Sequence, residues 1–447
     1  MTDIARTVLA IVVAALLAGG AWLTSPRVVT DQQFSDEGQL LFPGFTDPLQ
    51  ARVLEVVAYD EETASYRAFK VEFRDRQWVI PSHDDYPVDA EENMAAAASV
   101  LIGLTREQVI TDRAAEHESL GVLAPDDDNA PISGRGVRVT FSDGSGTQLA
   151  SLIIGHAVND TTAGSEGARR YVRIAGKNRV YAATFNHTFS TDFRDWVETD
   201  LLQLTGQTID RYEVDRYSID ERAGTKTASR RLSMSRTYDP AVPASARDWT
   251  VRETLAGEPV PTPAGATPDV EAINDVLNEI KKIRISGVRP KPQRLVELFE
   301  GRTNQVDVPE LMNLQSRGFF VDQNGQLLAN EGEVRVTTRD GVVLTMYFGE
   351  VLYGPAAAVS SGLGDVVNAS TESDGAGTEH RYMFVVASFD ESMFPEPQAP
   401  QAAGQGEDAT TSGAQAAYEQ ALAARQEKLD AGRSRADALR ARYANWY

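Results

Sequence analysis

The chain has 447 residues, of which 42% are hydrophobic, and this length and composition suit two or three globular domains with proper cores. Asp and Glu total 65 against 43 Lys and Arg, so the formal net charge is −22, and nucleic acid is not an expected partner because its phosphates are repelled. The absence of cysteine excludes disulfides, thiolate nucleophiles, Cys-ligated zinc and iron–sulfur clusters.

The N-terminal residues 1–24 contain an uncharged, apolar run from Thr7 to Leu23. As a helix this run spans about 25 Å at ~1.5 Å per residue, at the short end of what crosses a ~30 Å hydrocarbon layer. We therefore predict one N-terminal transmembrane anchor, with the long C-terminal part exported. A cleaved signal peptide is the alternative, because Ala18-Gly19-Gly20 resembles a small-residue cleavage site.

Residues 25–50 are polar, contain proline and are predicted to be a tether, and residues 51–207 are predicted to form a first α+β module. The alternation of apolar residues predicts strands at 52–59, 66–73, 78–80, 137–141, 149–154, 171–174 and 180–183. Apolar residues at helical spacing predict helices at 89–104, at 109–120 and from Thr191 through Leu204.

Residues 208–394 are predicted to form a second module because they repeat the first at a nearly constant spacing. The matched segments are Gly121–Leu123 with Gly318–Phe320, Val137–Thr140 with Val334–Thr337, Asp143-Gly144 with Asp340-Gly341, and Trp78 with Trp249. Hairpin strands grouped apart from helices are typical of antiparallel sheets. The predicted fold class is α+β: two tandem repeats of antiparallel sheet with packed helices, preceded by one N-terminal transmembrane helix.

The C-terminal part is predicted to be a linker, rich in Pro, Gln and Ala, over 395–414, followed by an amphipathic helix over 415–447. Leu422, Leu429, Ala436 and Tyr443 fall seven residues apart, and Arg425 and Gly432 interrupt the second apolar position of the heptads. Such a helix either docks onto the chain's own domains or is presented to a partner. The pattern favours neither.

The search for chemistry identifies no catalytic, cofactor-binding or metal-binding residue. The five histidines have no metal-ligand spacing, and Asp126–Asn129 lacks the calcium-loop pattern and is predicted to be a turn with Asx hydrogen bonding. The basic cluster Arg169, Arg170, Arg173, Lys177 and Arg179 is interpreted as a strand face that balances neighbouring carboxylates; binding of an acidic partner is the alternative. The chain is therefore expected not to be an enzyme and to need no cofactor.

Short motifs carry a family resemblance: Arg170–Arg173, Val180-Tyr181, Asp195-Trp196 with Leu201-Leu202, and Ile209. Through them most of residues 50–395 resembles two copies of the bacterial family known as domain of unknown function 4340. The resemblance implies single-pass proteins of the bacterial inner membrane, often encoded beside auxiliary components of gliding-type ABC transport systems. It brings no catalytic residues with it.

Two functional hypotheses result. The first is a non-enzymatic, membrane-anchored envelope accessory or scaffold protein. Its bulk would lie in the periplasm or extracellular space, and it would serve an ABC-type transport or gliding-like system through protein–protein contacts, with 415–447 as the candidate docking helix. The alternative is an envelope hydrolase or a carbohydrate-binding protein with a site between the two modules.

Overall fold

The structure is a computed structural model that describes residues 36–61, 64–158, 168–220, 225–236, 248–299, 301–303, 307–322, 324–353, 379–400 and 408–447. The chain divides into two compact units. The first unit comprises residues 1–68 and 92–191, and the second comprises residues 69–91 and 192–447.

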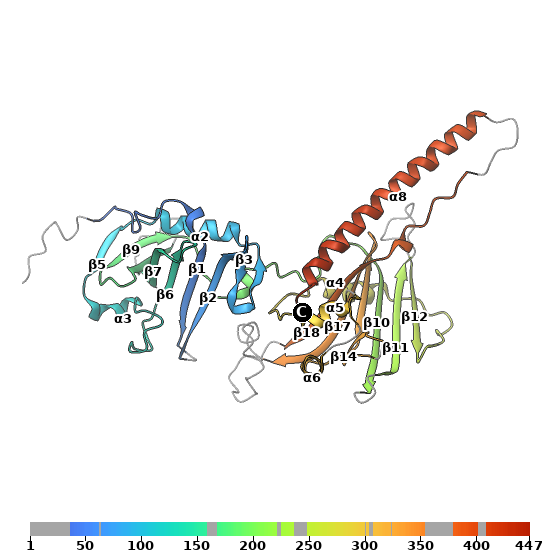
Figure 1. The fold of residues 1–447 in the computed structure, drawn as a ribbon, viewed down its shortest axis with the longest axis horizontal. Helices are drawn as coiled ribbons and strands as arrows, with labels where there is room; N and C mark the ends of the chain where they lie inside the picture. Colours follow the sequence, from blue (N-terminus) through green and yellow to red (C-terminus); the bar gives the residue numbers. More distant parts are fainter. Residues whose placement is uncertain are drawn as a thin grey trace, which may run out of the picture. The chain divides into compact units, whose positions relative to one another are not determined.

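The first unit is built on antiparallel strands in the order β1-β6-β7-β8-β9-β5 (Figure 1). These strands are β1 (Val53–Asp60), β5 (Gln108–Thr111), β6 (Val137–Ser142), β7 (Gln148–Ala157), β8 (Ala168–Ile174) and β9 (Val180–Phe185). Its helices are α2 (Glu91–Gly103), α3 (His117–Leu120) and the short 3-10 turns η2 (Pro48–Gln50) and η4 (Ala114–Glu116). Helix α2 buries Met94, Ala97 and Leu101 on one face, which follows the helical spacing of these residues.

The second unit is built on a seven-stranded antiparallel sheet in the order β13-β12-β11-β10-β16-β17-β18. Its strands are β10 (Ile209–Asp220), β11 (Thr225–Arg236), β12 (Trp249–Leu255), β13 (Glu258–Pro259), β16 (Glu333–Thr338), β17 (Val342–Tyr353) and β18 (Glu379–Phe389). Two shorter strands, β14 (Phe319–Val321) and β15 (Leu327–Ala329), pair with each other.

The helices of the second unit are α4 (Val270–Lys281), α5 (Gln293–Phe299), α6 (Val308–Gln315) and α8 (Asp408–Tyr443), with the 3-10 turns η3 (Pro81–His83), η5 (Phe193–Asp195) and η8 (Glu391–Met393). The unit also includes the end of β2 (Ser65–Arg74) and the strands β3 (Gln77–Ile80) and β4 (Tyr86–Val88). Its largest core joins the sheet to helices α4 and α8 through residues such as Leu277, Leu344 and Leu439.

The predicted fold class, α+β with two tandem repeats of sheet and packed helices behind a transmembrane helix, is wrong. The described residues form mostly antiparallel sheet with a few helices. No helix among those residues is long and apolar enough to cross a membrane. The predicted anchor at 1–24 lies outside the described residues.

Two predicted helices are replaced by other structure, and each has a local cause. The stretch 109–120 is divided among strand β5, turn η4 and the single turn α3, because Val109 pairs with Tyr181 of β9. The stretch from Thr191 to Leu204 contains only turn η5, and Gln203 has a positive φ of 49° that no α-helix accommodates. In the stretch from Thr191 to Leu204, the apolar residues at helical spacing are buried, but the segment that holds them is irregular.

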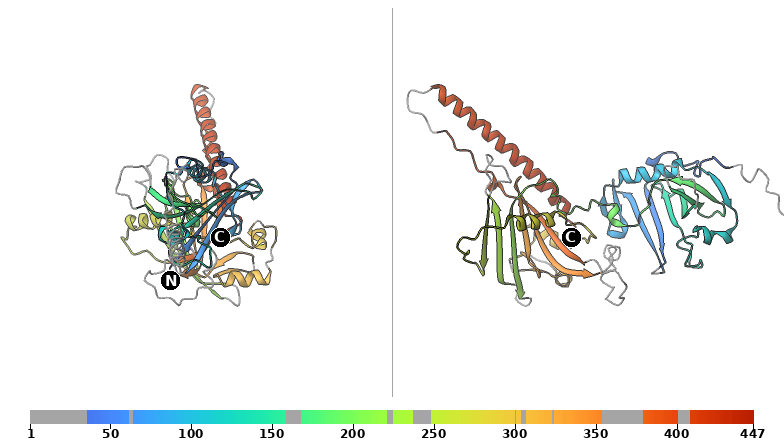
Figure 2. Two further views of the ribbon diagram at one scale, coloured as in Figure 1. Left: turned by 90° about the vertical axis from the view of Figure 1, so that its left-hand side faces the viewer. Right: turned by 180° about the vertical axis from the view of Figure 1, so that it is seen from behind.

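The predicted C-terminal helix is present as α8, and its two halves have different surroundings. The seated half, residues 429–443, packs on β17 and β18 and buries Leu429, Ala436, Leu439 and Tyr443. The projecting half, residues 408–428, extends away from the sheet, as the views in Figures 1 and 2 show. Docking onto the chain's own domain, one of the two interpretations, therefore applies to the seated half.

The two residues that interrupt the apolar heptads contact other parts of the second unit: Gly432 contacts the sheet, and Arg425 contacts the segment after β18. A side chain at Gly432 would overlap with the backbone oxygen of Asp340 and the ring of Phe389, so only glycine lets the helix approach this far. Arg425 Nε donates a hydrogen bond to the backbone oxygen of Phe394 at 2.9 Å. A search for apolar residues seven apart does not predict either contact, because glycine and arginine are not apolar heptad residues. Both residues nevertheless connect α8 to the rest of the second unit.

Replacement of Gly432 by Ala tests this close approach. Glycine inside a helix normally costs about 0.5–1 kcal/mol relative to alanine, so the substitution would stabilise an unhindered helix. Here we expect a loss of about 1–3 kcal/mol in the free energy of unfolding, measured by urea denaturation, because the methyl group overpacks the contact.

The matched control is Gly413→Ala in the projecting half of the same helix, where nothing lies within 4 Å of the added methyl group. This variant should be neutral or slightly stabilised. Equal effects at the two glycines would contradict the proposed close approach.

His83 attaches the segment 69–91 to the rest of the second unit. Its ring stacks on Phe193 with the ring centroids 4.3 Å apart, and only 5% of the residue is exposed. Burial, aided by the charge of Arg289, lowers the pKa of His83 from 6.5 to about 4. The unfolded chain therefore binds more protons than the folded protein between pH 6.5 and pH 4, and stability is lost as the pH falls through this range.

The substitution His83→Phe should remove this part of the acid sensitivity while keeping the ring stack. We expect the free energy of unfolding of the variant, relative to the wild type, to rise by about 2 kcal/mol between pH 7 and pH 4.5. Chemical denaturation at a series of pH values measures this difference. A constant difference would show that His83 protonates without cost in the folded protein.

Candidate functional site

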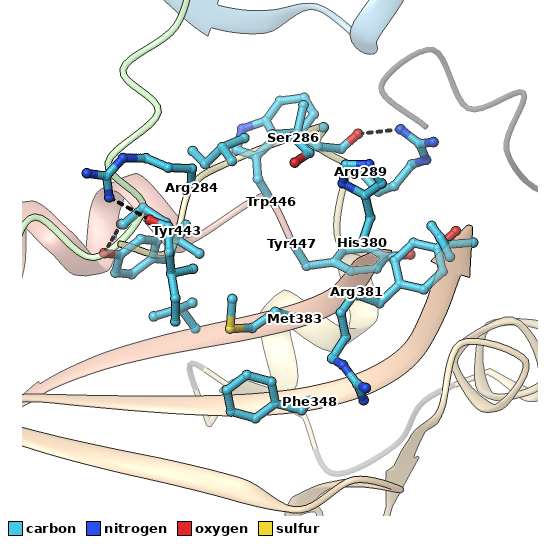
Figure 3. Close-up of a pocket in the computed structure, with 18 of the residues that line it drawn as sticks. Arg284, Ser286, Arg289, Phe348, His380, Arg381, Met383, Tyr443, Trp446 and Tyr447 are labelled. Carbon is cyan, nitrogen blue, oxygen red and sulfur yellow. Dashed lines mark hydrogen bonds between the residues drawn. The ribbon is translucent and has the colours of Figure 1, made fainter. Parts of the chain in front are cut away.

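A pocket with a volume of about 460 Å³ lies in the second unit, beside the end of α8 (Figure 3). Its walls come from β17 and β18, from the segment 283–289 that follows α4, and from the C-terminal residues after α8. Backbone hydrogen bonds between Arg289 and Tyr447, at 2.8 and 2.9 Å, hold the last two of these together. The volume falls in the range typical of small-molecule sites.

The pocket is mostly apolar. Strands β17 and β18 contribute Phe348, Leu352, Met383 and Val385, the segment 283–289 contributes Ile283, Ile285 and Val288, and the C-terminal region contributes Tyr443, Trp446 and Tyr447. Tyr447 is positioned by stacking on Phe384, with ring centroids 4.5 Å apart and planes 5° apart. These side chains form a surface suited to an acyl chain or an aromatic ring.

Four arginines line the same pocket, whereas Glu379 is its one lining carboxylate. Two of these arginines have long ion pairs: Arg284 lies 3.8 Å from Asp200, and Arg381 lies 3.6 Å from Glu379. Arg442 donates instead to the backbone oxygens of Glu198 and Asp200, at 2.8 and 3.4 Å. Backbone carbonyls do not cancel a full charge, so the pocket is cationic within an acidic chain.

Two buried polar atoms at the pocket have no hydrogen-bond partner among the residues that the structure describes. They are Nε2 of His380 and Nε of Arg442, and both residues line the cavity. A buried donor or acceptor left unsatisfied costs about 1–3 kcal/mol. Such atoms beside a cavity are the groups that a polar ligand atom would satisfy.

Lys291 fastens the end of α8 next to this pocket. Its Nζ donates to the backbone oxygen of Tyr443 at 2.6 Å and lies 5.4 Å from the ring centroid of Phe384. Only 8% of the residue is exposed, and burial lowers the pKa of the ammonium group from 10.5 to about 8. Tyr443 also donates its hydroxyl to the backbone oxygen of Leu201 at 2.6 Å, and burial raises its pKa.

The Lys291→Met variant tests the cost of this buried charge. Because the pKa of Lys291 is lower in the folded protein, the unfolded chain binds more protons between pH 8 and pH 10.5, and stability rises with pH in that range. We expect the wild type to gain about 2 kcal/mol of unfolding free energy relative to the variant between pH 8 and pH 10. The contribution of the tyrosines cancels in this comparison, because they titrate in both proteins. A difference in unfolding free energy that does not change with pH would mean that Lys291 stays protonated in the folded protein.

The remaining histidines examined as candidates have structural surroundings. His117 is buried and its Nε2 lies 2.8 Å from the backbone oxygen of Asn178. Among the residues that the structure describes, no group of three or more His, Asp or Glu side chains is arranged to hold a metal ion. The predicted Asx turn is confirmed at Asp127, whose Oδ1 accepts from the backbone N–H of Asn129 at 3.0 Å.

The basic cluster of the first unit is engaged within the protein. Arg179 forms a two-pronged ion pair with Asp112, at 2.7 and 3.0 Å, and contacts Asp36 at 3.2 Å. Arg173 differs from the prediction of an exposed face, because it is buried and its Nε donates to the backbone oxygen of Val122 at 2.9 Å. The charge-balancing interpretation describes this cluster better than a free basic patch.

Two buried acids of the second unit are likewise occupied by structural partners. Asp210 binds Arg236 at 2.8 Å and both nitrogens of the Arg339 fork at 3.0 Å. Burial acts to raise the pKa of Asp215, but hydrogen bonds from its three polar neighbours outweigh burial and leave the pKa lowered; these neighbours are Ser229, Lys226 and Arg231. Neither carboxylate is placed to exchange protons with a bound molecule.

The sequence predicted none of the pocket as a site. His380 was treated only as one of five histidines without metal-ligand spacing, and Ile283 lies in the segment after α4, which ends at Lys281. A usable signal was present in the arginines at 284 and 289, which flank the apolar residues of the segment 283–289. These arginines indicate a pocket only once the structure shows that β18 lies beside the segment 283–289.

The comparisons with known proteins identify one family. Residues 78–298 match the family described as Domain of unknown function (DUF4340), which supports the resemblance to a domain of unknown function. The match runs across the position 207/208 at which we divided two copies, so the two-copy arrangement stays a prediction. Searches of curated proteins and of solved structures found no significant match.

Proposed function

We propose that the protein is a non-enzymatic accessory or scaffold protein of the bacterial envelope that acts through protein–protein contacts. Its folded units would work in the periplasm or extracellular space, and its partner would be a component of an ABC-type transport or gliding-like system. The observation that carries the proposal is helix α8, whose seated half is fixed to the sheet while its projecting half extends from it (Figure 1).

The projecting half has the properties of a presented helix. It continues the apolar stripe of the seated half at Leu422 and Tyr418, which remain partly exposed, and its alanines at 417, 421 and 424 are fully exposed. A stripe that is continuous with a packed interface can receive a second helix in the same way. We propose that a helix of the partner protein docks along this half.

The pocket chemistry supports a non-enzymatic role. Acid–base catalysis needs a proton donor or acceptor oriented by a neighbour. In the described part of the chain, Glu379 is the nearest carboxylate to Arg381, and His380 Nε2 has no hydrogen-bond partner to orient it. These groups suit binding of an anion better than transfer of a proton.

Site-specific photo-cross-linking in cells tests the docking helix. A photoreactive residue at exposed Ala421 should capture transporter subunits, identified by mass spectrometry, whereas the same residue at exposed Ala438 of the seated half should not. With the photoreactive residue kept at Ala421, substitution of both Ala417 and Ala424 by Glu should reduce capture at least about tenfold.

The matched control places two Glu residues at exposed alanines of the seated half with the same spacing, Ala431 and Ala438, and capture by the residue at 421 should stay within about twofold of the wild type. Capture that is insensitive to both sets of substitutions would count against α8 as the docking element. If the photoreactive residue captures no envelope protein at all, the result would count against the accessory role as a whole.

A further inference from the structure

The pocket beside the end of α8 combines an apolar interior with an excess of positive charge. Its apolar side chains come from three separate parts of the second unit, so the space is enclosed by folding and is not a gap in one loop. Figure 3 shows Phe348 and Met383 on the strands that form one wall, with Trp446 across the space from them. An apolar body fits between these side chains.

Among the residues that the structure describes, no carboxylate pairs tightly with Arg284, Arg381 or Arg442. Arg284, Arg381 and Arg442 all contribute guanidinium groups, and the carboxylates that approach Arg284 and Arg381 are no closer than 3.6 Å. Elsewhere the chain pairs arginines tightly, as in the contact of Arg138 with Asp126 at 2.6 Å. The loose pairing at the pocket leaves attraction available for an anion.

The unsatisfied atoms indicate where the polar part of a ligand would bind. Arg442 Nε is a permanent donor, and His380 Nε2 can donate or accept according to its tautomer. A carboxylate or phosphate oxygen accepts hydrogen bonds from a guanidinium group and balances its charge. A purely apolar ligand would leave both atoms unsatisfied and would retain their desolvation cost.

We propose that this pocket binds an amphiphilic anion: a molecule with one carboxylate or phosphate group and an apolar chain or ring. The anionic group is held by the arginine side chains of the pocket, and the apolar part lies against Phe348, Met383 and Trp446. This site is independent of the projecting half of α8, because none of its lining residues belongs to 408–428.

Isothermal titration calorimetry of the full chain tests the site with decanoate, decyl phosphate, 1-decanol and acetate, all below micelle formation. We expect saturable one-to-one binding of decanoate or decyl phosphate, and the tighter of the two identifies the head group. 1-Decanol should bind at least about tenfold more weakly, because it cannot form charge-assisted hydrogen bonds, and acetate should not bind measurably.

Three variants connect binding to this pocket. Arg442→Gln should weaken decanoate binding about tenfold or more, and Glu379→Gln, which removes the one lining carboxylate, should strengthen it about threefold. Arg433→Gln is the control, since Arg433 lies on the same helix, pairs with Glu391 at 2.7 Å and does not line the pocket. Circular dichroism establishes that each variant is folded.

The proposal is overturned if decanoate shows no saturable binding, or if 1-decanol binds as tightly as decanoate. It is also overturned if the folded Glu379→Gln variant binds with unchanged affinity. Should Arg442→Gln fail to fold, the Glu379→Gln variant and the 1-decanol comparison still decide the outcome.

Discussion

The close approach of α8 to the sheet at Gly432 is the contact on which the rest of the second unit depends. The seated half of the helix positions Tyr443. The backbone oxygen of Tyr443 accepts a hydrogen bond from Lys291, and its hydroxyl donates one to the backbone oxygen of Leu201. The residues that follow then turn back to the segment 283–289 and complete the pocket. A side chain at position 432 would displace this whole set of contacts from the strands.

Electrostatics in this protein is arranged by burial as well as by net charge. The chain carries a net charge of −22, yet its most buried acids are neutralised by arginines, as Asp210 is by Arg236 and Arg339. Around the pocket the opposite arrangement holds, because arginines outnumber acids there. An acidic surface would repel anions at long range, so an anionic ligand would experience attraction only within about a Debye length of the pocket.

Local patterns predicted elements well where one face of an element is buried, and poorly where the chain is irregular. The strand segments Val137–Thr140 and Val334–Thr337 lie in β6 and β16, because alternation reports directly on a half-buried strand. The predicted helix beginning at Thr191 failed because Phe193 and Trp196 are buried by an irregular segment. Helical spacing alone does not distinguish those two cases.

The site was beyond sequence reasoning for a different reason. Its residues come from segments separated by up to several hundred positions, and each segment alone has an ordinary composition. Arg425 and Gly432 illustrate the same limit, since both interrupt an apolar repeat, whereas in the structure Gly432 contacts the sheet and Arg425 contacts Phe394 in the segment after β18. Long-range contacts give such residues their meaning, and no local pattern encodes those contacts.

The projecting half of α8 also sets a rotational phase. At ~1.5 Å per residue its 408–428 segment is a rod about 30 Å long, and each residue turns the direction of its side chains by about 100°. The seated half fixes the starting angle of this rod against the sheet. One residue inserted at the junction of the two halves would rotate the side chains of the projecting half by about 100° relative to the sheet. Seven inserted residues would restore nearly the same orientation and lengthen the helix. The length of this helix therefore sets both how far the projecting half extends and which way its side chains face.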